Sequence, residues 1–378
     1  MVKENQLRLP DKGFQKKFVH GLINWNKAEN KRSMPWKNEK DPYKIWLSEI
    51  ILQQTKVEQG LSYYNRFVQT YPTIEQLAVA PEKQVFKLWE GLGYYSRCKN
   101  LIHTAGFINR ELNGIFPKDY SSILNLKGVG PYTASAIASF AYNLPYAVLD
   151  GNVFRVLSRI FDIELPIDQK QGKHFFSMLA QNILPKNTAG EYNQAIMDFG
   201  ATVCKPAPEC AKCFFNKHCK AFLSSKQTLL PVKSKQLKIK ERWFNYIVLK
   251  HLDTFAIRKR ITKDIWQNLF EFLLIETPGI AKQNEILNAL QKSYSFQSKP
   301  VVTKKIQVAQ LLTHQLIHFS FFEIELFQRI SLNGFNWVAK EELADYPFPK
   351  TVQLFIQNTL LNQEVPIAGK KFAFYNLI

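Results

Sequence analysis

The sequence predicts an α+β fold of more than one domain, with an all-helical domain followed by a domain of mixed strands and helices. The chain has 378 residues, which suffices for two or three domains of roughly 150 residues each. Apolar residues recur at helical spacing up to about residue 222. Short strand-like runs replace this pattern after residue 242. The two patterns together predict the change of architecture along the chain.

The first part of the chain carries both apolar stripes and residues that begin helices. Asp41 is suited to an N-cap, with Pro42 at the first helical position. Behind them five residues follow the i, i+3, i+4, i+7, i+8 spacing: Tyr43, Trp46, Leu47, Ile50 and Ile51. The same pattern follows Asp150-Gly151-Asn152, at Val153, Val156, Leu157, Ile160 and Phe161. Core packing accounts for these apolar residues.

A basic segment separates the two parts. Residues 226–242 hold six basic residues against the single acid Glu241, which predicts an exposed linker. We therefore expect a helical domain over 1–225 and a second domain over 243–378. In the second domain we expect strands at 246–249, 255–257, 271–275 and 321–326, and helices near 282–292 and 304–312.

The charge of the chain points to an anionic partner. It carries 50 Lys and Arg against 31 Asp and Glu, a net charge of +19. Residues 1–225 contribute 29 basic and 19 acidic residues, and residues 226–378 contribute 21 and 12, so both parts are basic. An excess of this kind favours nucleic acid or a membrane surface. Because no apolar run reaches the roughly 20 residues of a spanning helix, we expect an intracellular protein, no membrane, and nucleic acid as the partner.

A tight turn between two helices is predicted at 126–134, Leu-Lys-Gly-Val-Gly-Pro-Tyr-Thr-Ala. Gly128 and Gly130 let the backbone bend closely, and Pro131 opens the second helix. The amides of such a helix-hairpin-helix turn point outward and hold a DNA phosphate without reading sequence. A plain connector between helices is the alternative, and the basic charge favours the DNA interpretation.

Four of the five cysteines lie within one short segment with the spacing C-x5-C-x2-C-x5-C, namely Cys204, Cys210, Cys213 and Cys219. In a chain without secretory features this predicts a metal site. Structural zinc sites usually pair two tight knuckles, whereas a compact set of four thiolates favours a [4Fe-4S] cluster. Zinc remains the alternative. The expected role is structural, to fix a basic loop that faces DNA.

Two carboxyl groups are placed for acid–base work. Glu49 lies within a helix between Ile45 and Leu52, where partial desolvation raises the pKa of the carboxyl group. Asp150 stands at a helix start, where backbone amides and the helix dipole favour the anion. Two carboxyl groups whose pKa values are shifted in opposite directions suit cleavage of a glycosidic bond. The alternatives are a solvated Glu49 and a simple N-cap at Asp150.

These features resemble the endonuclease III superfamily, and within it the MutY family of adenine DNA glycosylases. The resemblance rests on Trp46-Leu-Ser-Glu-Ile-Ile-Leu-Gln-Gln-Thr-Lys-Val, Trp89-Glu-Gly-Leu-Gly-Tyr-Tyr-Ser-Arg and Leu149-Asp-Gly-Asn-Val. It extends from about residue 7 to the C-terminus and is strongest over 34–219. It implies excision of adenine opposite 8-oxoguanine or G in duplex DNA, with a [4Fe-4S] cluster, in a monomer associated with the nucleoid in bacterial cytoplasm.

The resemblance also implies roles for individual residues. Glu49 would protonate the adenine leaving group and later activate water, and Asp150 would stabilise the oxocarbenium-like sugar. Tyr132 and Asn152 would support this catalytic group. Lyase-type relatives have a lysine at the position of Tyr132, which forms a Schiff base with the sugar. The tyrosine therefore predicts a monofunctional glycosylase.

Further residues match the family's contacts to DNA. Gln54 and Tyr94 would wedge into the duplex while the adenine is flipped out. The adenine pocket would be walled by Trp36 and Met34, with core packing as the alternative for Trp36. Two departures lie beside it: Lys37 replaces an arginine, which loses bidentate contacts, and Gln194 stands where some members have glutamate. The first cysteine spacing is also one residue shorter than the usual x6.

The C-terminal part resembles a Nudix-like domain that recognises 8-oxoguanine. The clearest match is Asp264-Ile-Trp-Gln-Asn-Leu-Phe-Glu-Phe. Leu312-Thr313-His314 stands where the family often has Phe-Ser-His, so Thr313 and His314 are candidates to hydrogen-bond the oxidised base. Leu312 replaces an aromatic residue there. An ordinary histidine in a helix-to-strand connection is the alternative. The glutamate cluster of a Nudix hydrolase is missing, so nucleotide hydrolysis is not expected.

Two other functions are weighed against adenine excision. The first is a glycosylase of the same superfamily with another target, such as thymine opposite G or an oxidised pyrimidine. Tyr132 argues against such an enzyme with lyase activity, and the Nudix-like part argues against such an enzyme with or without lyase activity. A DNA-binding protein without catalysis needs neither Glu49 nor Asp150.

Overall fold

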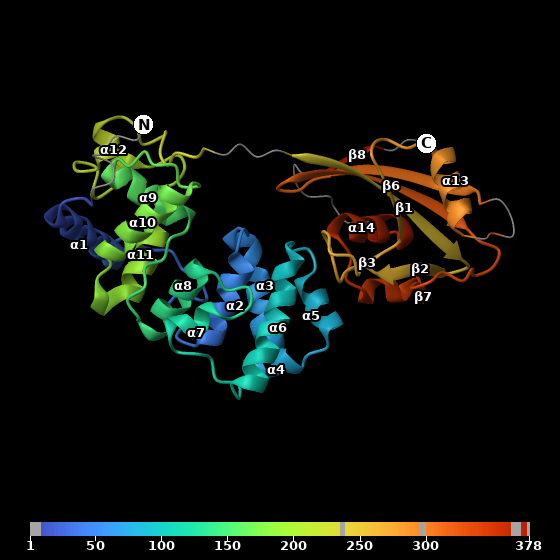
Figure 1. The fold of residues 1–378 in the computed structure, drawn as a ribbon, viewed down its shortest axis with the longest axis horizontal. Coiled ribbons are helices and arrows are strands. Elements are labelled where there is room, and N and C mark those ends of the chain that lie inside the picture. Colours follow the sequence, from blue (N-terminus) through green and yellow to red (C-terminus); the bar gives the residue numbers. More distant parts are fainter. Residues whose placement is uncertain (1–8, 235–238, 295, 297–299, 364–371, 376–378) are drawn as a thin grey trace. The chain divides into compact units, whose positions relative to one another are not determined.

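The computed structural model describes residues 9–234, 239–294, 296, 300–363 and 372–375. The chain divides into two compact units, which Figure 1 shows coloured along the sequence. The first unit consists of Met1–Val79 with Lys99–Lys235, and the second of Ala80–Cys98 with Gln236–Ile378. No helix among the described residues is long and apolar enough to cross a membrane.

The first unit is built from helices, as the sequence predicts. Helix α6 (Tyr95–Glu111) begins in the second unit and continues into the first. The remaining helices of the first unit are α1 (Lys12–Ala28), α2 (Pro42–Leu52), α3 (Val57–Thr70), α4 (Ile74–Val79), α7 (Tyr120–Leu124), α8 (Pro131–Tyr142), α9 (Gly151–Phe161), α10 (Lys170–Ile183), η2 (Lys186–Thr188), α11 (Ala189–Thr202), η3 (Cys210–Lys212) and α12 (Lys220–Leu223).

The predicted helix starts are confirmed. The Asp41 carboxylate accepts a hydrogen bond from the Tyr43 amide, and Pro42 occupies the first position of α2. The Asp150 carboxylate accepts from the Val153 amide at 2.8 Å and caps α9. A side-chain oxygen at this position satisfies an amide that the helix itself leaves without an acceptor.

The predicted turn between two helices is also present, between α7 and α8. Gly128 has a φ of +83°, a backbone conformation that side chains disfavour, and a Cβ there would lie 2.8 Å from the Asn100 Cβ. Gly130 caps α8 ahead of Pro131, and a Cβ there would meet nothing within 4 Å. The Thr104 hydroxyl donates to the Lys127 carbonyl and ties the turn to α6.

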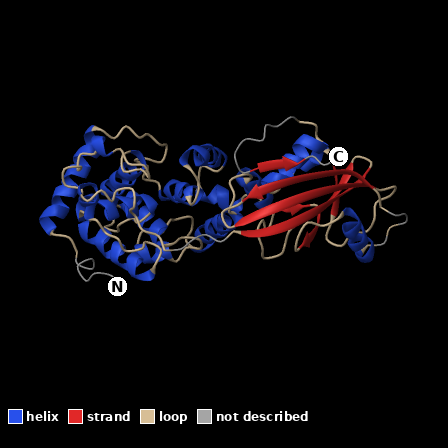
Figure 2. Cartoon of the chain, turned by 90° about the horizontal axis from the view of Figure 1, so that it is seen from above, coloured by secondary structure: helices blue, strands red, loops and turns tan. Residues whose placement is uncertain are grey.

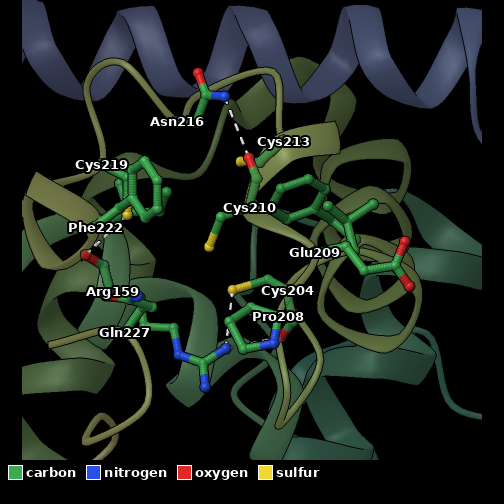
Figure 3. A pocket seen from close by; sticks show the side chains of 13 residues that line it. Arg159, Cys204, Pro208, Glu209, Cys210, Cys213, Asn216, Cys219, Phe222 and Gln227 are labelled. Atoms are coloured by element: carbon green, nitrogen blue, oxygen red, sulfur yellow. Dashed lines mark hydrogen bonds between the residues drawn. The ribbon is translucent and has the colours of Figure 1, made fainter. Parts of the chain in front are cut away.

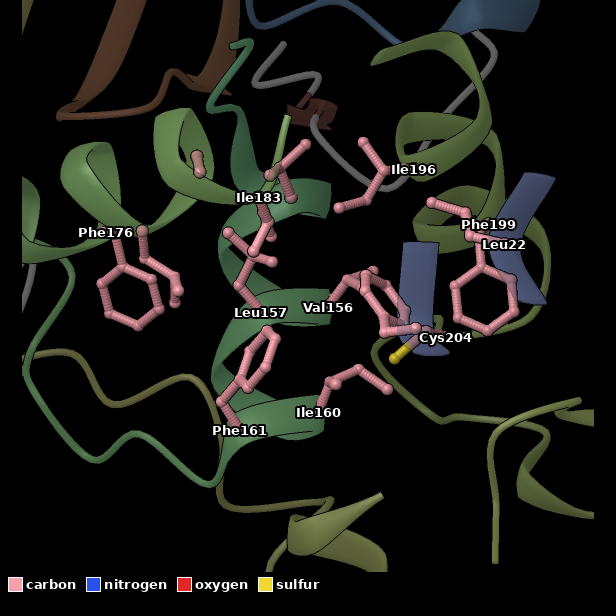
Figure 4. Packing of buried hydrophobic residues seen from close by; sticks show 14 of the residues in the cluster. Leu22, Val156, Leu157, Ile160, Phe161, Phe176, Ile183, Ile196, Phe199 and Cys204 are labelled. Atoms are coloured by element: carbon pink, nitrogen blue, oxygen red, sulfur yellow. The ribbon is translucent and has the colours of Figure 1, made fainter. Parts of the chain in front are cut away.

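Helix α9 lies at the centre of the main apolar core of this unit. Its inward residues Val156, Leu157 and Ile160 are at most 1% exposed. Figure 4 shows them projecting from one helix toward side chains of α1, α10 and α11. Burial of this stripe fixes α9 and the residues at its start.

The second unit holds all of the described strands, which Figure 2 shows in red, and they form one mixed sheet. The sheet order is β3-β2-β1-β6-β5-β8, while β4 pairs with β1 and β7 with β2. Only β1 and β6 run parallel, with Phe244 opposite Phe319. The strands are β1 (Lys240–His251), β2 (Thr254–Lys259), β3 (Phe270–Glu271), β4 (Leu273–Thr277), β5 (Val302–Leu311), β6 (Gln315–Glu325), β7 (Asn336–Ala339) and β8 (Phe372–Tyr375).

Helices complete the second unit. They are α5 (Glu82–Trp89), α13 (Gln283–Ser293), η4 (Glu341–Asp345), α14 (Lys350–Phe355) and η5 (Ile356–Leu360). The helix expected at 282–292 is confirmed, but the one expected at 304–312 is wrong. That segment is strand β5, which pairs with both β6 and β8. Its apolar residues Ile306 and Val308 alternate with polar neighbours, and pairing on both edges decides the conformation.

The basic segment 226–242 is more ordered than an exposed linker. Leu230 is buried in the core of the first unit, and the Lys226 ammonium contacts Asp162 and Glu164. The Ser234 amide and hydroxyl donate to the Asp168 carboxylate. Arg242 lies in β1 and is buried. Leu230 and Arg242 are thus buried against expectation, whereas Lys233, Ser234, Lys240 and Glu241 are exposed as predicted. Residues 235–238 lie outside the described part.

The two glycines of the helical turn give a prediction about stability. Gly128→Ala should lower the free energy of unfolding by about 2 to 3 kcal/mol, because it forces an alanine into positive φ and against Asn100. Gly130→Ala is the matched control and should lower it by less than about 1 kcal/mol. Urea unfolding of both variants measures this, and equal effects would contradict the prediction.

Candidate functional site

A buried carboxyl group forms the centre of the first unit's candidate site. Glu49 lies on α2 and is 7% exposed. Burial raises the pKa of Glu49 to about 7, an effect that a hydrogen bond from Tyr132 reduces and the charge of Asp150 reinforces. The predicted rise in pKa is therefore confirmed. Near neutral pH this group can both hold and release a proton.

Tyr132 connects Glu49 to the helical turn. It is the second residue of α8, directly after Pro131. Burial and the neighbouring Glu49 and Asp150 raise the pKa of Tyr132 well above its usual range, so its phenol stays protonated and donates to Glu49. The phenol oxygen also lies 3.9 Å from the Met197 Sδ.

Asp150 departs from expectation in one respect. Its carboxylate accepts hydrogen bonds from the Val153 amide at 2.8 Å and the Asn152 Nδ2 at 2.7 Å. These contacts lower the pKa of Asp150, yet burial raises it more, so the net direction is upward. The expectation that helix-start amides decide this pKa is wrong, because desolvation outweighs them. A positive charge nearby would favour the anion.

Asn152 forms part of a chain of hydrogen bonds that leads away from Asp150. Its Oδ1 accepts from the Arg155 guanidinium at 2.8 Å. Arg155 also donates to the carbonyl oxygens of Cys204 and Gly200, each at 2.7 Å. Helix α9 thus joins the acid at its start to the cysteine segment. The sequence reasoning missed Arg155, although it lies three residues after Asn152 on one helix face.

The four clustered cysteines surround one pocket, which Figure 3 shows from close by. All four thiols are free. The Arg159 guanidinium donates to the Cys204 Sγ at 3.5 Å, and the Phe215 amide to the Cys213 Sγ at 3.4 Å. Burial raises the pKa of Cys213 to about 12.

These thiols fit a thiolate-bound metal centre in the chemistry of their donors. Four soft sulfur ligands converge on one pocket, and N–H donors face two of the sulfurs. Such buried thiols become thiolates only beside a strong positive charge, which a metal supplies. Within the described residues no group of three or more His, Cys, Asp or Glu is already arranged around a single metal ion.

Lys37 and Gln194 are brought together, on a buried carboxylate that the sequence reasoning missed. The Lys37 ammonium lies 3.0 Å from the Asp198 Oδ2, and the Gln194 amide donates to Asp198 Oδ1 at 3.0 Å. Arg32 contacts the same carboxylate at 2.8 Å, and Asn30 contacts it at 2.9 Å. Asp198 is fully buried. Its spacing of four from Gln194 on α11 is the signal that was available.

The remaining predicted residues of the first unit lie near its surface. Trp36 packs edge-on against Tyr64 at a ring separation of 5.2 Å and is half-buried, so packing accounts for part of its surface. Met34 is also half-buried. Gln54 is exposed and has a φ of +55°, a strained conformation for glutamine just after α2.

The second unit brings Tyr94 and Thr313 together. Their hydroxyl groups share a hydrogen bond. Tyr94 is exposed with a φ of +50°. Thr313 and His314 occupy a hairpin turn between strands β5 and β6, so the alternative of a helix-to-strand connection is wrong. The His314 carbonyl accepts from the Lys240 amide, and the Leu312 amide donates to the Gln315 carbonyl.

Two family models match successive parts of the chain. Residues 47–178 match the model described as "HhH-GPD superfamily base excision DNA repair protein". Residues 245–358 match the model of the NUDIX domain. The first match includes the second half of α2 with Glu49, the helical turn and α9, and the second includes most of the sheet.

Named relatives extend over most of the chain. An adenine DNA glycosylase of Buchnera aphidicola subsp. Baizongia pistaciae is 34% identical over 81% of this chain and 84% of its own length. One from Buchnera aphidicola subsp. Schizaphis graminum is 32% identical over 90% and 98%. Among solved structures, a thermostable thymine-DNA glycosylase is 27% identical with a TM-score of 0.52, over 56% of this chain and 98% of its own.

The raised pKa of Glu49 predicts a pH dependence of stability. Because the folded state holds the proton up to about pH 7, the stabilisation is complete at low pH and is lost as the pH rises through 7. Glu49→Gln stays neutral, so between pH 5 and pH 8 it should gain up to about 3 kcal/mol in unfolding free energy relative to the parent.

Urea unfolding of parent and variant at the two pH values measures this gain. Glu58→Gln, on an exposed position of α3, is the matched control for a glutamate-to-glutamine change. A difference between Glu49→Gln and parent that stays constant from pH 5 to pH 8 would show that Glu49 is not desolvated.

Proposed function

The chain belongs to the adenine DNA glycosylase family, and on that premise we propose that it excises adenine opposite 8-oxoguanine or G in duplex DNA. It is a base excision repair glycosylase with a helical HhH-GPD domain followed by a Nudix-like domain. The observation that carries the proposal is the buried Glu49 with its pKa near 7, hydrogen-bonded to Tyr132 and facing the charge of Asp150.

Glu49 and Asp150 take different roles in the proposed reaction. Protonated Glu49 donates to the leaving adenine, which lets the N-glycosidic bond break with its electrons on the base. Positive charge then develops on the sugar. Asp150, buried and raised in pKa, is stabilised as an anion by that charge and stabilises it in return. Water activated by Glu49 completes hydrolysis and leaves an abasic site.

Tyr132 supports a reaction without strand cleavage. A Schiff base requires an amine, and a phenol held protonated between two carboxyl groups cannot form one. Its place at the start of α8 and its hydrogen bond to Glu49 give it a positioning role. We therefore propose a monofunctional enzyme.

The partner in this proposal is double-stranded DNA. The turn with Gly128 and Gly130 binds a backbone phosphate, and the open space beside Gly130 supports this. Gln54 and Tyr94 enter the duplex, and Trp36 and Met34 line the adenine pocket beside Lys37 and Gln194. In the second unit Thr313 and His314 hydrogen-bond the oxidised guanine, supported by their position at an exposed hairpin turn.

Cys204, Cys210, Cys213 and Cys219 would hold a [4Fe-4S] cluster. When bound, the cluster supplies a fixed link among four thiolates, which orders the segment 204–219. Arg155 and Arg159 then connect this segment to α9 and to Asp150 at its start. The contacts support a structural role for the cluster.

Adenine release tests the proposed activity. The parent should release adenine from A opposite 8-oxoguanine and from A opposite G, leave T opposite G intact, and give strand breaks only after alkali. Glu49→Gln should still bind the 8-oxoguanine duplex but lose at least about 100-fold in rate, because the proton donor is gone. Release of thymine instead of adenine would favour the other glycosylase class. Parental activity in the variant would refute the assigned acid.

Metal analysis tests the cofactor. The purified protein should contain about four iron atoms per chain and a broad visible absorption band. Cys213→Ser should lose both, whereas Cys98→Ser, the buried cysteine outside the cluster, should keep them. One zinc per chain without iron would overturn the cluster.

A further inference from the structure

The segment Ala80–Cys98 belongs to the second unit, although the chain returns to the first unit after it. This segment includes α5, Glu90 and Tyr94. In the second unit it lies against the residues around α14. The contacts of Glu90 hold the two pieces together.

Glu90 is a buried carboxylate that accepts hydrogen bonds from several donors. Its side chain is 6% exposed. Oε1 accepts from the Phe348 amide at 2.8 Å, and Oε2 accepts from the Gln353 Nε2 at 2.8 Å and the Lys87 Nζ at 2.7 Å. Burial raises the pKa of Glu90, and the Lys87 ammonium opposes that rise. A buried charge of this kind persists only where its partners are fixed.

Neighbouring contacts extend the same junction toward solvent. The Lys87 ammonium also donates to the Tyr346 carbonyl at 3.3 Å, and the Lys83 ammonium lies 3.5 Å above the Tyr346 ring. At the rim, Lys259 and Glu82 form an exposed ion pair at 3.1 Å. Exposed pairs contribute little, so the buried contacts of Glu90 contribute more to the junction than this rim pair does.

Two sets of residues connect this junction to the hydrogen-bonded hydroxyl groups of Tyr94 and Thr313. On one side, Tyr94 follows Glu90 by four residues, and the Arg97 guanidinium lies 5.3 Å from its ring and from that of Trp89. On the other side, Gln353 belongs to α14, as described above. Thr351 of the same helix donates to the Gln310 side chain at 2.6 Å, at the end of β5 that leads to the turn.

We propose that Glu90 is a positioning residue for recognition of the oxidised guanine. By joining the Tyr94 segment to α14, it keeps the Tyr94 hydroxyl against Thr313 and so fixes the pair of groups that meets the lesion. The inference rests on the proposed function of Tyr94 and Thr313. It assigns preference for 8-oxoguanine over guanine to a residue that contacts neither base.

The test compares single-turnover adenine release and duplex affinity for A opposite 8-oxoguanine and A opposite G. Glu90→Gln replaces one acceptor oxygen by a donor. It should lower the preference for the 8-oxoguanine duplex at least about tenfold, the effect of losing a buried hydrogen bond to a charged group. The rate at saturating enzyme should stay within about threefold of the parent, because Glu49 and Asp150 are untouched. Glu82→Gln, on the exposed pair of the same helix, is the matched control and should keep parental preference.

Two further variants separate positioning from general destabilisation. Glu90→Gln with Gln353→Glu restores a carboxylate–amide pair and should recover the preference. Tyr94→Phe removes the hydrogen bond to Thr313, and its effect on preference should not add to that of Glu90→Gln, since both act on one contact. Gln353→Ala removes one donor to Glu90 and should show a smaller loss of preference for the 8-oxoguanine duplex. This variant tests the proposal if Glu90→Gln does not fold.

The outcomes are distinct. Parental preference in a folded Glu90→Gln or Gln353→Ala variant overturns the inference, as does full additivity with Tyr94→Phe or a folded charge swap without recovery. A parent that releases adenine from neither duplex refutes the proposed function instead. Circular dichroism and melting temperature establish that each variant is folded.

Discussion

The first unit depends on the hydrogen bonds and packing that helix α9 makes along its whole length. At its start the Asp150 carboxylate caps the helix and accepts a hydrogen bond from the Asn152 side chain. In its middle Arg155 joins Asn152 to the Cys204 carbonyl, and near its end the Arg159 guanidinium reaches the Cys204 sulfur. The opposite face is buried in the main core. Because one helix carries all of these groups, it links the cysteine segment to the carboxylate of Asp150.

Desolvation sets the chemistry of the two carboxyl groups. Burial raises the pKa of both Glu49 and Asp150, and the hydrogen bonds of Asp150 do not reverse this. A site with two buried acids favours whatever brings positive charge. In the proposed reaction the sugar brings it, at the moment the bond to adenine breaks.

Two other buried carboxylates, Asp198 and Glu90, organise the surroundings. The Asp198 carboxylate accepts hydrogen bonds from Arg32 and Gln194 and forms an ion pair with Lys37, so Lys37 has a defined partner. The Glu90 carboxylate accepts hydrogen bonds from Phe348 and Gln353, which are distant from it in sequence. Both follow one rule: a buried charge needs several partners, and these partners come from pieces of chain that are distant in sequence.

The sequence by itself determined the helical first part, the starts of α2 and α9, the glycine turn and the rise in the Glu49 pKa. These depend on local spacing, caps and flanking apolar residues. Tertiary structure alone decided that 304–312 is a strand, that burial outweighs the cap at Asp150, and that Lys37 and Gln194 meet on Asp198. Each of these outcomes depends on segments far apart in sequence. Strand pairing and desolvation arise only when such segments come together, so they cannot be predicted from a local sequence pattern.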